Sequence, residues 1–149
     1  MKLALAVIVL QNSPEVLEEI GLCINAISPD AFKRTFFVTS QEEALACMAG
    51  ATRTVVISGN VISSMCLGDG IKFAADVKAE RPEVSFLMYS THPTPDPIVD
   101  GYIPKAGLER LDPARHLPLA EVVARITDKT TLEDILRFPE VLPWHRVAA

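Results

Sequence analysis

The chain has 149 residues, of which 49% are hydrophobic and 22% charged, a balance typical of one globular domain. Its net charge is −5 and it contains no run of lysine or arginine, so its field repels nucleic-acid phosphates. We therefore expect no nucleic-acid binding by this chain alone. No apolar run approaches the roughly 20 residues that cross a bilayer, and we expect no membrane association.

Three cysteines, Cys23, Cys47 and Cys66, lie far apart and form no C-x-x-C pair. Neither a disulfide framework nor a thiolate metal site is indicated, and we expect a reduced, cytoplasmic protein without a metal or a cofactor. The apolar run 3–10 near the start resembles a signal peptide. Because the run is short and no small-residue cleavage site follows promptly, we interpret it as a strand.

Strands and helices are expected to alternate along the chain. The unbroken apolar run 3–10 suits a strand that is covered on both faces. Ser13 and Pro14 supply a cap and a first helical position, and Ser40 and Gly50 bound a second helix. The expected elements are, in chain order, strand 3–10, helix 14–27, strand 35–38, helix 41–49, strand 54–58, helix 71–81, strand 85–89, strand 101–104, helix 118–128 and helix 131–138. This order predicts a flavodoxin-like α/β fold with a doubly wound, five-stranded parallel sheet.

The connection between the fourth and fifth strands is unusual because it contains Pro93, Pro95 and Pro97. Prolines at this density exclude a helix, so the helix that would join these strands is expected to be shortened or missing. We expect residues 1–128 to form the domain. Residues 129–149 are expected to form a C-terminal helix and tail that packs on the domain or on a partner.

The residues that follow the strands are the ones to inspect, because ligands bind at the carboxyl ends of strands in doubly wound sheets. In chain order these positions hold Gln11-Asn12, Gly59, Asp69-Gly70, Ser90-Thr91 and Lys105. Over roughly residues 1–128, this order resembles the receiver domains of bacterial response regulators. The resemblance implies a receiver-like fold.

The resemblance also implies that the phosphorylation chemistry is absent. Gly59 stands where the family carries its phosphate-accepting aspartate, and Gln11 and Asn12 stand where it carries two acids. Glycine has no side chain to phosphorylate, and amides remove two negative charges that attract magnesium. The segment between Gly59 and Asp69 is longer than in the family, which would let it fold over the pocket. The expected degenerate pocket comprises Gln11, Asn12, Gly59, Asn60, Ser90 and Lys105, without catalytic residues and without a metal.

The missing helix predicts a contact surface. Its loss is expected to expose sheet near Ile98, Tyr102 and Ile103, which with Trp144 would form a partner or dimer face. Alternatively, the tail around Trp144 covers the gap. The sequence leaves both interpretations open.

Three functions follow as hypotheses. The first is a non-enzymatic pseudo-receiver that acts in signalling by contact with an unidentified protein partner, as a homodimer. The second is a small-molecule or anion-binding domain, or a small enzyme, that uses the strand-end crevice. The third is a fragment of a larger regulator, with the region after Thr130 as a linker to an output domain.

The enzyme hypothesis finds little support in the sequence. No G-x-G-x-x-G or G-x-x-x-x-G-K-[ST] motif is present. His92, His116 and His145 are scattered without the spacing of a general base or a metal site. Asp96 and Asp100 are interpreted as solvated turn acids.

Overall fold

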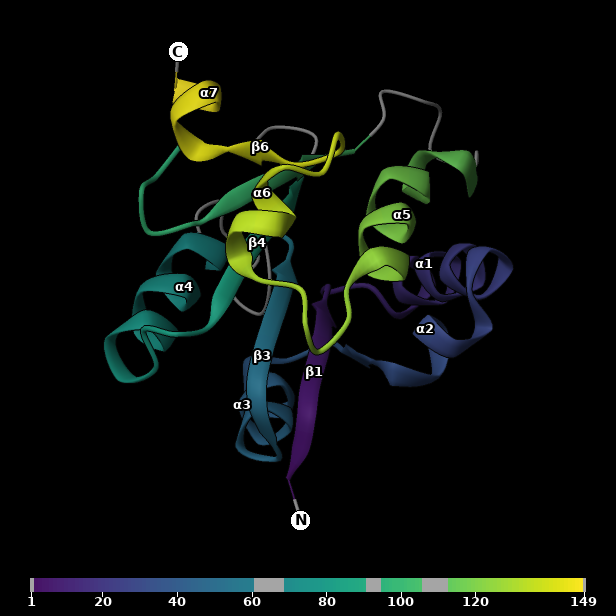
Figure 1. Ribbon diagram of the computed structural model, residues 1–149, viewed down its shortest axis with the longest axis horizontal. Helices are drawn as coiled ribbons and strands as arrows, with labels where there is room; N and C mark the ends of the chain where they lie inside the picture. The colour runs from purple at the N-terminus through teal and green to yellow at the C-terminus, as the bar shows by residue number, and fades with distance from the viewer. Residues whose placement is uncertain (1, 61–68, 91–94, 106–112, 149) are drawn as a thin grey trace.

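A computed structural model describes residues 2–60, 69–90, 95–105 and 113–148. Within these residues strands and helices alternate as the sequence predicts (Figure 1). The elements are β1 Leu3–Leu10, α1 Pro14–Ile27, α2 Pro29–Arg34, β2 Thr35–Val38, α3 Gln41–Ala49, β3 Ala51–Ser58, α4 Asp69–Glu80, β4 Ser85–Ser90, β5 Gly101–Pro104, the 3-10 helix η1 Pro113–His116, α5 Leu117–Arg125, α6 Leu132–Leu136, β6 Leu142–Pro143 and α7 Trp144–Ala148.

The described strands form one six-stranded sheet in the order β2-β1-β3-β4-β5-β6. The five strands expected from the sequence run parallel, which confirms the doubly wound α/β fold. The sixth strand, β6, runs antiparallel to β5 and was not predicted. Leu10 pairs with both Val38 and Ser58, so the carboxyl ends of the first three strands lie at one edge of the sheet.

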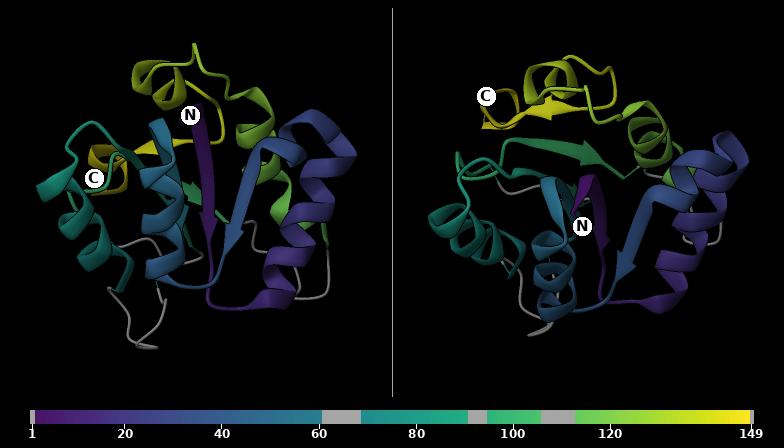
Figure 2. Two further views of the ribbon diagram at one scale, coloured as in Figure 1. Left: turned by 90° about the horizontal axis from the view of Figure 1, so that it is seen from below. Right: turned by 60° about the horizontal axis from the view of Figure 1, so that its bottom comes forward.

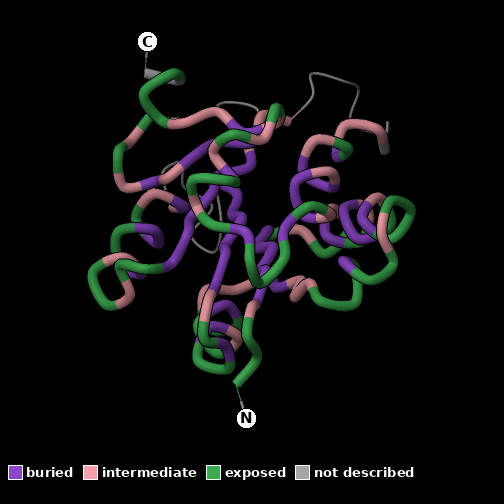
Figure 3. The backbone as a smooth tube through the Cα atoms, in the orientation of Figure 1, coloured by how far each residue is buried: buried purple, intermediate pink, exposed green. Residues whose placement is uncertain are grey.

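Helices cover both faces of the sheet. Helices α1 and α5 lie on one face, and α3 and α4 lie on the other (Figures 1 and 2). The side chains of Val7 and Val9 of β1 enter the core on the face covered by α1 and α5. Those of Ala6, Ile8 and Leu10 enter the core on the face covered by α3 and α4. Both faces of β1 are therefore buried, which explains its unbroken apolar sequence and the buried centre in Figure 3.

Side-chain caps set most helix starts. Ser13 accepts a hydrogen bond from the Val16 N–H, and Thr131 forms a capping box at the start of α6. The predicted helices 14–27 and 41–49 have the expected bounds, whereas α5 and α6 end earlier than predicted. Helix α2 was missed, although Ser28 followed by Pro29 repeats the signal at the start of α1.

The C-terminal tail, residues 129–149, covers the part of the sheet that the missing helix was expected either to leave exposed or to leave to the tail. Strand β6 pairs Leu142 with Tyr102, and Val141 and Ile135 join the core that contains Ile103. Tyr102 and Ile103 are consequently fully buried. The interpretation of these two residues as part of an exposed partner face is therefore wrong, and cover by the chain's own tail is what the structure shows.

Of the four residues predicted to form the contact face, only Ile98 and Trp144 remain partly exposed. Ile98 is half-buried, and Trp144 is 37% exposed. The loop before β5 contributes to the cover, because the Asp96 N–H donates to the Tyr102 hydroxyl at 2.8 Å. Residues 95–100 contain no helix, as expected, while the rest of this connection, 91–94, lies outside the described residues.

The interpretation of Asp100 as a solvated turn acid is wrong. Its carboxylate accepts hydrogen bonds from Lys78 Nζ at 2.7 Å and from the Phe86 N–H at 2.8 Å, and its side chain is 17% exposed. It thus ties α4 and β4 to the start of β5. None of the described helices has the length and apolar character needed to cross a membrane.

Candidate functional site

The carboxyl ends of β1 and β3 bring Gln11 and Gly59 together. The Gln11 N–H donates to the Val38 carbonyl at 3.2 Å, and the Gly59 N–H donates to the Leu10 carbonyl at 3.0 Å. A Cβ atom at position 59 would lie 3.2 Å from both Nε2 and Oε1 of Gln11. The Gln11 amide therefore occupies the space beside Gly59 into which a longer side chain would extend.

Polar side-chain atoms beside Gly59 are buried without partners among the described residues. Gln11 and Asn60 are each 4% exposed, and Gln11 Nε2, Asn60 Nδ2 and Asn60 Oδ1 form no hydrogen bond with any residue that the structure describes. Buried polar groups in this condition cost free energy and are uncommon in folded proteins. They are the groups here that a bound polar molecule would pair. Asn12, by contrast, is exposed.

The first turn of α4 packs directly on this end of β3. The Gly70 N–H donates to the Asn60 carbonyl at 3.2 Å, and the Ser58 hydroxyl donates to the Gly59 carbonyl at 2.8 Å. A Cβ at position 70 would lie only 2.3 Å from the Gly59 carbonyl oxygen. Glycine is therefore required there. The segment predicted to fold over the pocket, 61–68, lies outside the described residues.

Lys105 lies at the end of β5, where its N–H donates to the Ser90 carbonyl at 3.2 Å. Its Nζ stands 5.1 Å from the centre of the Tyr89 ring, a cation–π contact. Burial lowers the pKa of Lys105, as does the charge of Arg115, while Glu19 opposes the shift. Lys105 is thus a half-buried cation held over an aromatic ring. Thr91, predicted beside Ser90, lies outside the described residues.

A buried polar network on the α1 side of β4 escaped the sequence analysis. The Tyr89 hydroxyl lies 2.6 Å from His116 Nδ1, and His116 Nε2 lies 3.0 Å from a Glu19 carboxylate oxygen. Arg115 pairs with the same Glu19 oxygen at 3.1 Å. The network joins three elements, α1, β4 and η1, and fastens the start of α5 to the rest of the fold.

The electrostatics of this network indicate a structural role. Burial lowers the pKa of His116 although its hydrogen bond to Glu19 opposes the shift, and burial raises the pKa of Tyr89. The hydrogen bond between His116 and Glu19 is the largest of the effects that lower the pKa of Glu19. Tyr89 and His116 are both fully buried, so their polar atoms contact each other and the chain rather than solvent. The signal for this network that the sequence offered was Tyr89, whose hydroxyl is a polar group within the apolar strand 85–89.

The network predicts a loss of stability on acidification. The pKa of His116 is lowered by folding, so the unfolded chain takes up the proton first, and the free energy of unfolding should fall as pH drops below about 6.5. The lowered pKa of Glu19 acts in the same sense, in a window below about 4.5. Urea unfolding from pH 7 to pH 5 measures the slope. His116→Gln is expected to flatten it, and an unchanged slope would contradict this assignment.

Comparison with solved structures identifies the architecture as the fold of response-regulator receiver domains. The chain is similar to the isolated REC domain of RcsB from Salmonella enterica serovar Typhimurium, with 18% identity and a TM-score of 0.55 over 80% of this chain and 85% of that one. It is similar to the chemotaxis response regulator CheY4 of Vibrio cholerae, with 19% identity and a TM-score of 0.56 over 83% of this chain and 99% of that one. At these identities the likeness establishes the fold alone. No protein-family model matches the sequence, and no curated protein matches it.

Proposed function

We propose that this chain is a non-phosphorylatable pseudo-receiver, a signalling module of two-component type that acts by protein contact. The observation that carries the proposal is the arrangement of Gly59 and Gln11 at the end of β3. Gly59 offers no acceptor carboxylate, and the Gln11 amide occupies the adjacent space at 3.2 Å from where a Cβ would lie. Fold alone does not imply activity, so the proposal rests on these residues.

The magnesium ion that receiver chemistry requires does not fit the residues present. Magnesium prefers anionic oxygen ligands in a near-octahedral arrangement. The chain offers the neutral amides of Gln11 and Asn12 and the bare backbone of Gly59. Among the described residues, no group of three His, Cys, Asp or Glu side chains is placed to hold a metal ion. No step of the proposed function passes through a metal.

The cation at the end of β5 supports the same proposal. Lys105 matches the lysine that receivers use toward phosphate, yet its ammonium group lies over the Tyr89 ring and beside the Glu19–Arg115–His116 network. The ammonium group is thus already in contact with a ring of this chain, while burial and the charge of Arg115 lower the pKa of Lys105. In this proposal, surface residues such as Trp144 and Ile98 make the contact with a partner. The homodimer expected from the sequence stays a prediction.

The proposal predicts that the chain takes up no phosphoryl group from acetyl phosphate and magnesium. The measurement is intact mass after incubation, with and without hydroxylamine, which removes acyl phosphates. The positive control is the triple variant Gln11→Asp/Asn12→Asp/Gly59→Asp, which restores the acceptor and both acids and should gain a hydroxylamine-labile adduct. A labile adduct on the unaltered chain would overturn the proposal.

The alternative function, a small-molecule or anion-binding domain, has one observation in its favour. The buried polar atoms of Gln11 and Asn60 that have no partner within the described residues would pair with a polar ligand. Inorganic phosphate added during thermal unfolding provides the comparison, since a ligand at a hundred times its dissociation constant adds about 2.7 kcal/mol. A raised unfolding midpoint, absent in Asn60→Leu, would favour this alternative over the contact module.

A further inference from the structure

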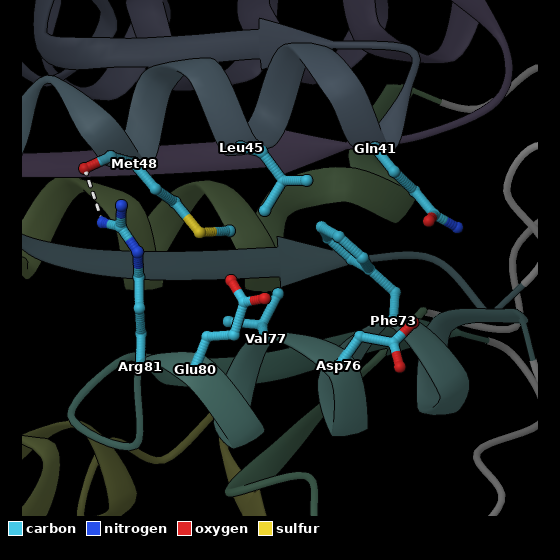
Figure 4. A pocket seen from close by; sticks show the side chains of 8 residues that line it. All are labelled: Gln41, Leu45, Met48, Phe73, Asp76, Val77, Glu80 and Arg81. Atoms are coloured by element: carbon cyan, nitrogen blue, oxygen red, sulfur yellow. Dashed lines mark hydrogen bonds between the residues drawn. The ribbon is translucent and has the colours of Figure 1, made fainter.

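A second surface feature lies between helices α3 and α4, away from the strand ends. It is a groove with a cavity of about 120 Å³ (Figure 4). Side chains of α3 form one wall, and side chains of α4 and the residue that follows it form the other. The lining residues are Gln41, Leu45, Met48, Phe73, Asp76, Val77, Glu80 and Arg81.

The floor of the groove is apolar and is formed by buried side chains. Met48, Phe73 and Val77 are 0%, 2% and 3% exposed and belong to the core beneath α3 and α4. Leu45 stands above them and is 45% exposed, one of the large hydrophobic side chains left in contact with solvent. An apolar cavity of about 150 Å³ can hold benzene, so this groove accommodates about one large apolar side chain.

The rim of the groove is acidic. Asp76 and Glu80 lie one helical turn apart on α4, and both are exposed. Neither forms an ion pair or a hydrogen bond within the described part of the chain. Arg81 adds one positive charge to the lining but forms no salt bridge with either acid within the described residues, and its guanidinium donates to the Met48 carbonyl at 3.1 Å at one end of the groove (Figure 4).

We propose that this groove binds a basic amphipathic segment of a partner protein. One large apolar side chain of the segment fills the cavity beside Leu45, and lysine or arginine side chains on its flank pair with Asp76 and Glu80. The negative charges of Asp76 and Glu80 at the rim favour a basic segment over a neutral or acidic one. A second copy of this chain, with its net charge of −5, is disfavoured on the same ground. The inference does not depend on whether the strand-end site accepts phosphate.

The proposal is tested by selecting a displayed library of random peptides on the immobilised full chain, and then titrating an enriched peptide by fluorescence anisotropy. Enriched peptides should share one large apolar residue and at least one lysine or arginine. The double variant Asp76→Asn/Glu80→Gln should weaken binding about fivefold at low salt and less at high salt. Leu45→Glu should weaken it by at least about tenfold.

The matched control is Asp128→Asn/Glu133→Gln, which removes the same charge from exposed positions outside the groove and should bind as the unaltered chain does. Thermal unfolding of each variant checks its fold. The proposal is overturned if no peptide is enriched, if the enriched peptides lack basic residues, or if they bind the rim variant equally well. Self-association abolished by Leu45→Glu would place a second copy in the groove and would also overturn it.

Discussion

Removing residues 129–149 is expected to destabilise the domain by at least about 5 kcal/mol, which is comparable to the whole stability of many domains. The deletion takes Ile135 and Val141 out of the core and uncovers Ile103 on one face and Tyr102 on the other. Fully burying each such side chain contributes about 1.5–3 kcal/mol. Urea unfolding followed by circular dichroism measures the difference between the full and the shortened chain.

A point substitution in the same segment serves as the control. Trp144 is 37% exposed and its ring contacts His145 rather than the core, so Trp144→Ala should cost less than about 1.5 kcal/mol. A shortened chain that unfolds cooperatively within about 1 kcal/mol of the full chain would show that residues 1–128 form a self-sufficient domain. That result would contradict the role assigned here to β6 and α6.

Gly70→Ala is expected to cost about 2–4 kcal/mol, the effect of a clash with backbone that cannot move aside cheaply. The added Cβ would lie 2.3 Å from the Gly59 carbonyl oxygen and 3.1 Å from Asn60 Cα. Either α4 shifts away from β3 or the end of β3 is displaced. Chemical denaturation gives the free-energy change, and amide chemical shifts of residues 58–60 report the displacement.

Gly50→Ala is the matched control for this change. A Cβ at position 50 would meet only the Cys47 carbonyl at 3.6 Å, an ordinary contact, and the backbone there has φ −89°. We expect a change of less than about 1 kcal/mol, in either direction. Equal losses in the two variants would mean that the cost at position 70 is not steric.

The sequence predicted the parallel core because its signals are local. Apolar runs such as 3–10 reflect burial on both faces, and caps such as Ser40 are read from neighbouring residues. The same local signal, Ser28 followed by Pro29, stands at the start of α2, a helix of six residues that was not predicted.

The remaining errors come from contacts between distant parts of the chain. β6 has two residues, one of them Pro143, and these residues form a strand only because they pair with β5. Glu19 and His116 are separated by 97 positions, and no spacing rule connects them. Similarly, the sequence predicted Gln11 and Gly59 as members of one site, but only the structure shows the amide lying against the glycine.

The antiparallel strand β6 also bears on how the folded sheet meets other chains. An unpaired edge strand offers backbone donors and acceptors on which further strands can be added, leading to aggregation. Here the side of β5 away from β4 pairs with a strand of only two residues, and one of them is a proline, which has no N–H to donate. The sheet therefore ends on this side in a strand that is a poor template for further pairing, which disfavours strand addition at the β6 edge; the opposite edge is formed by β2.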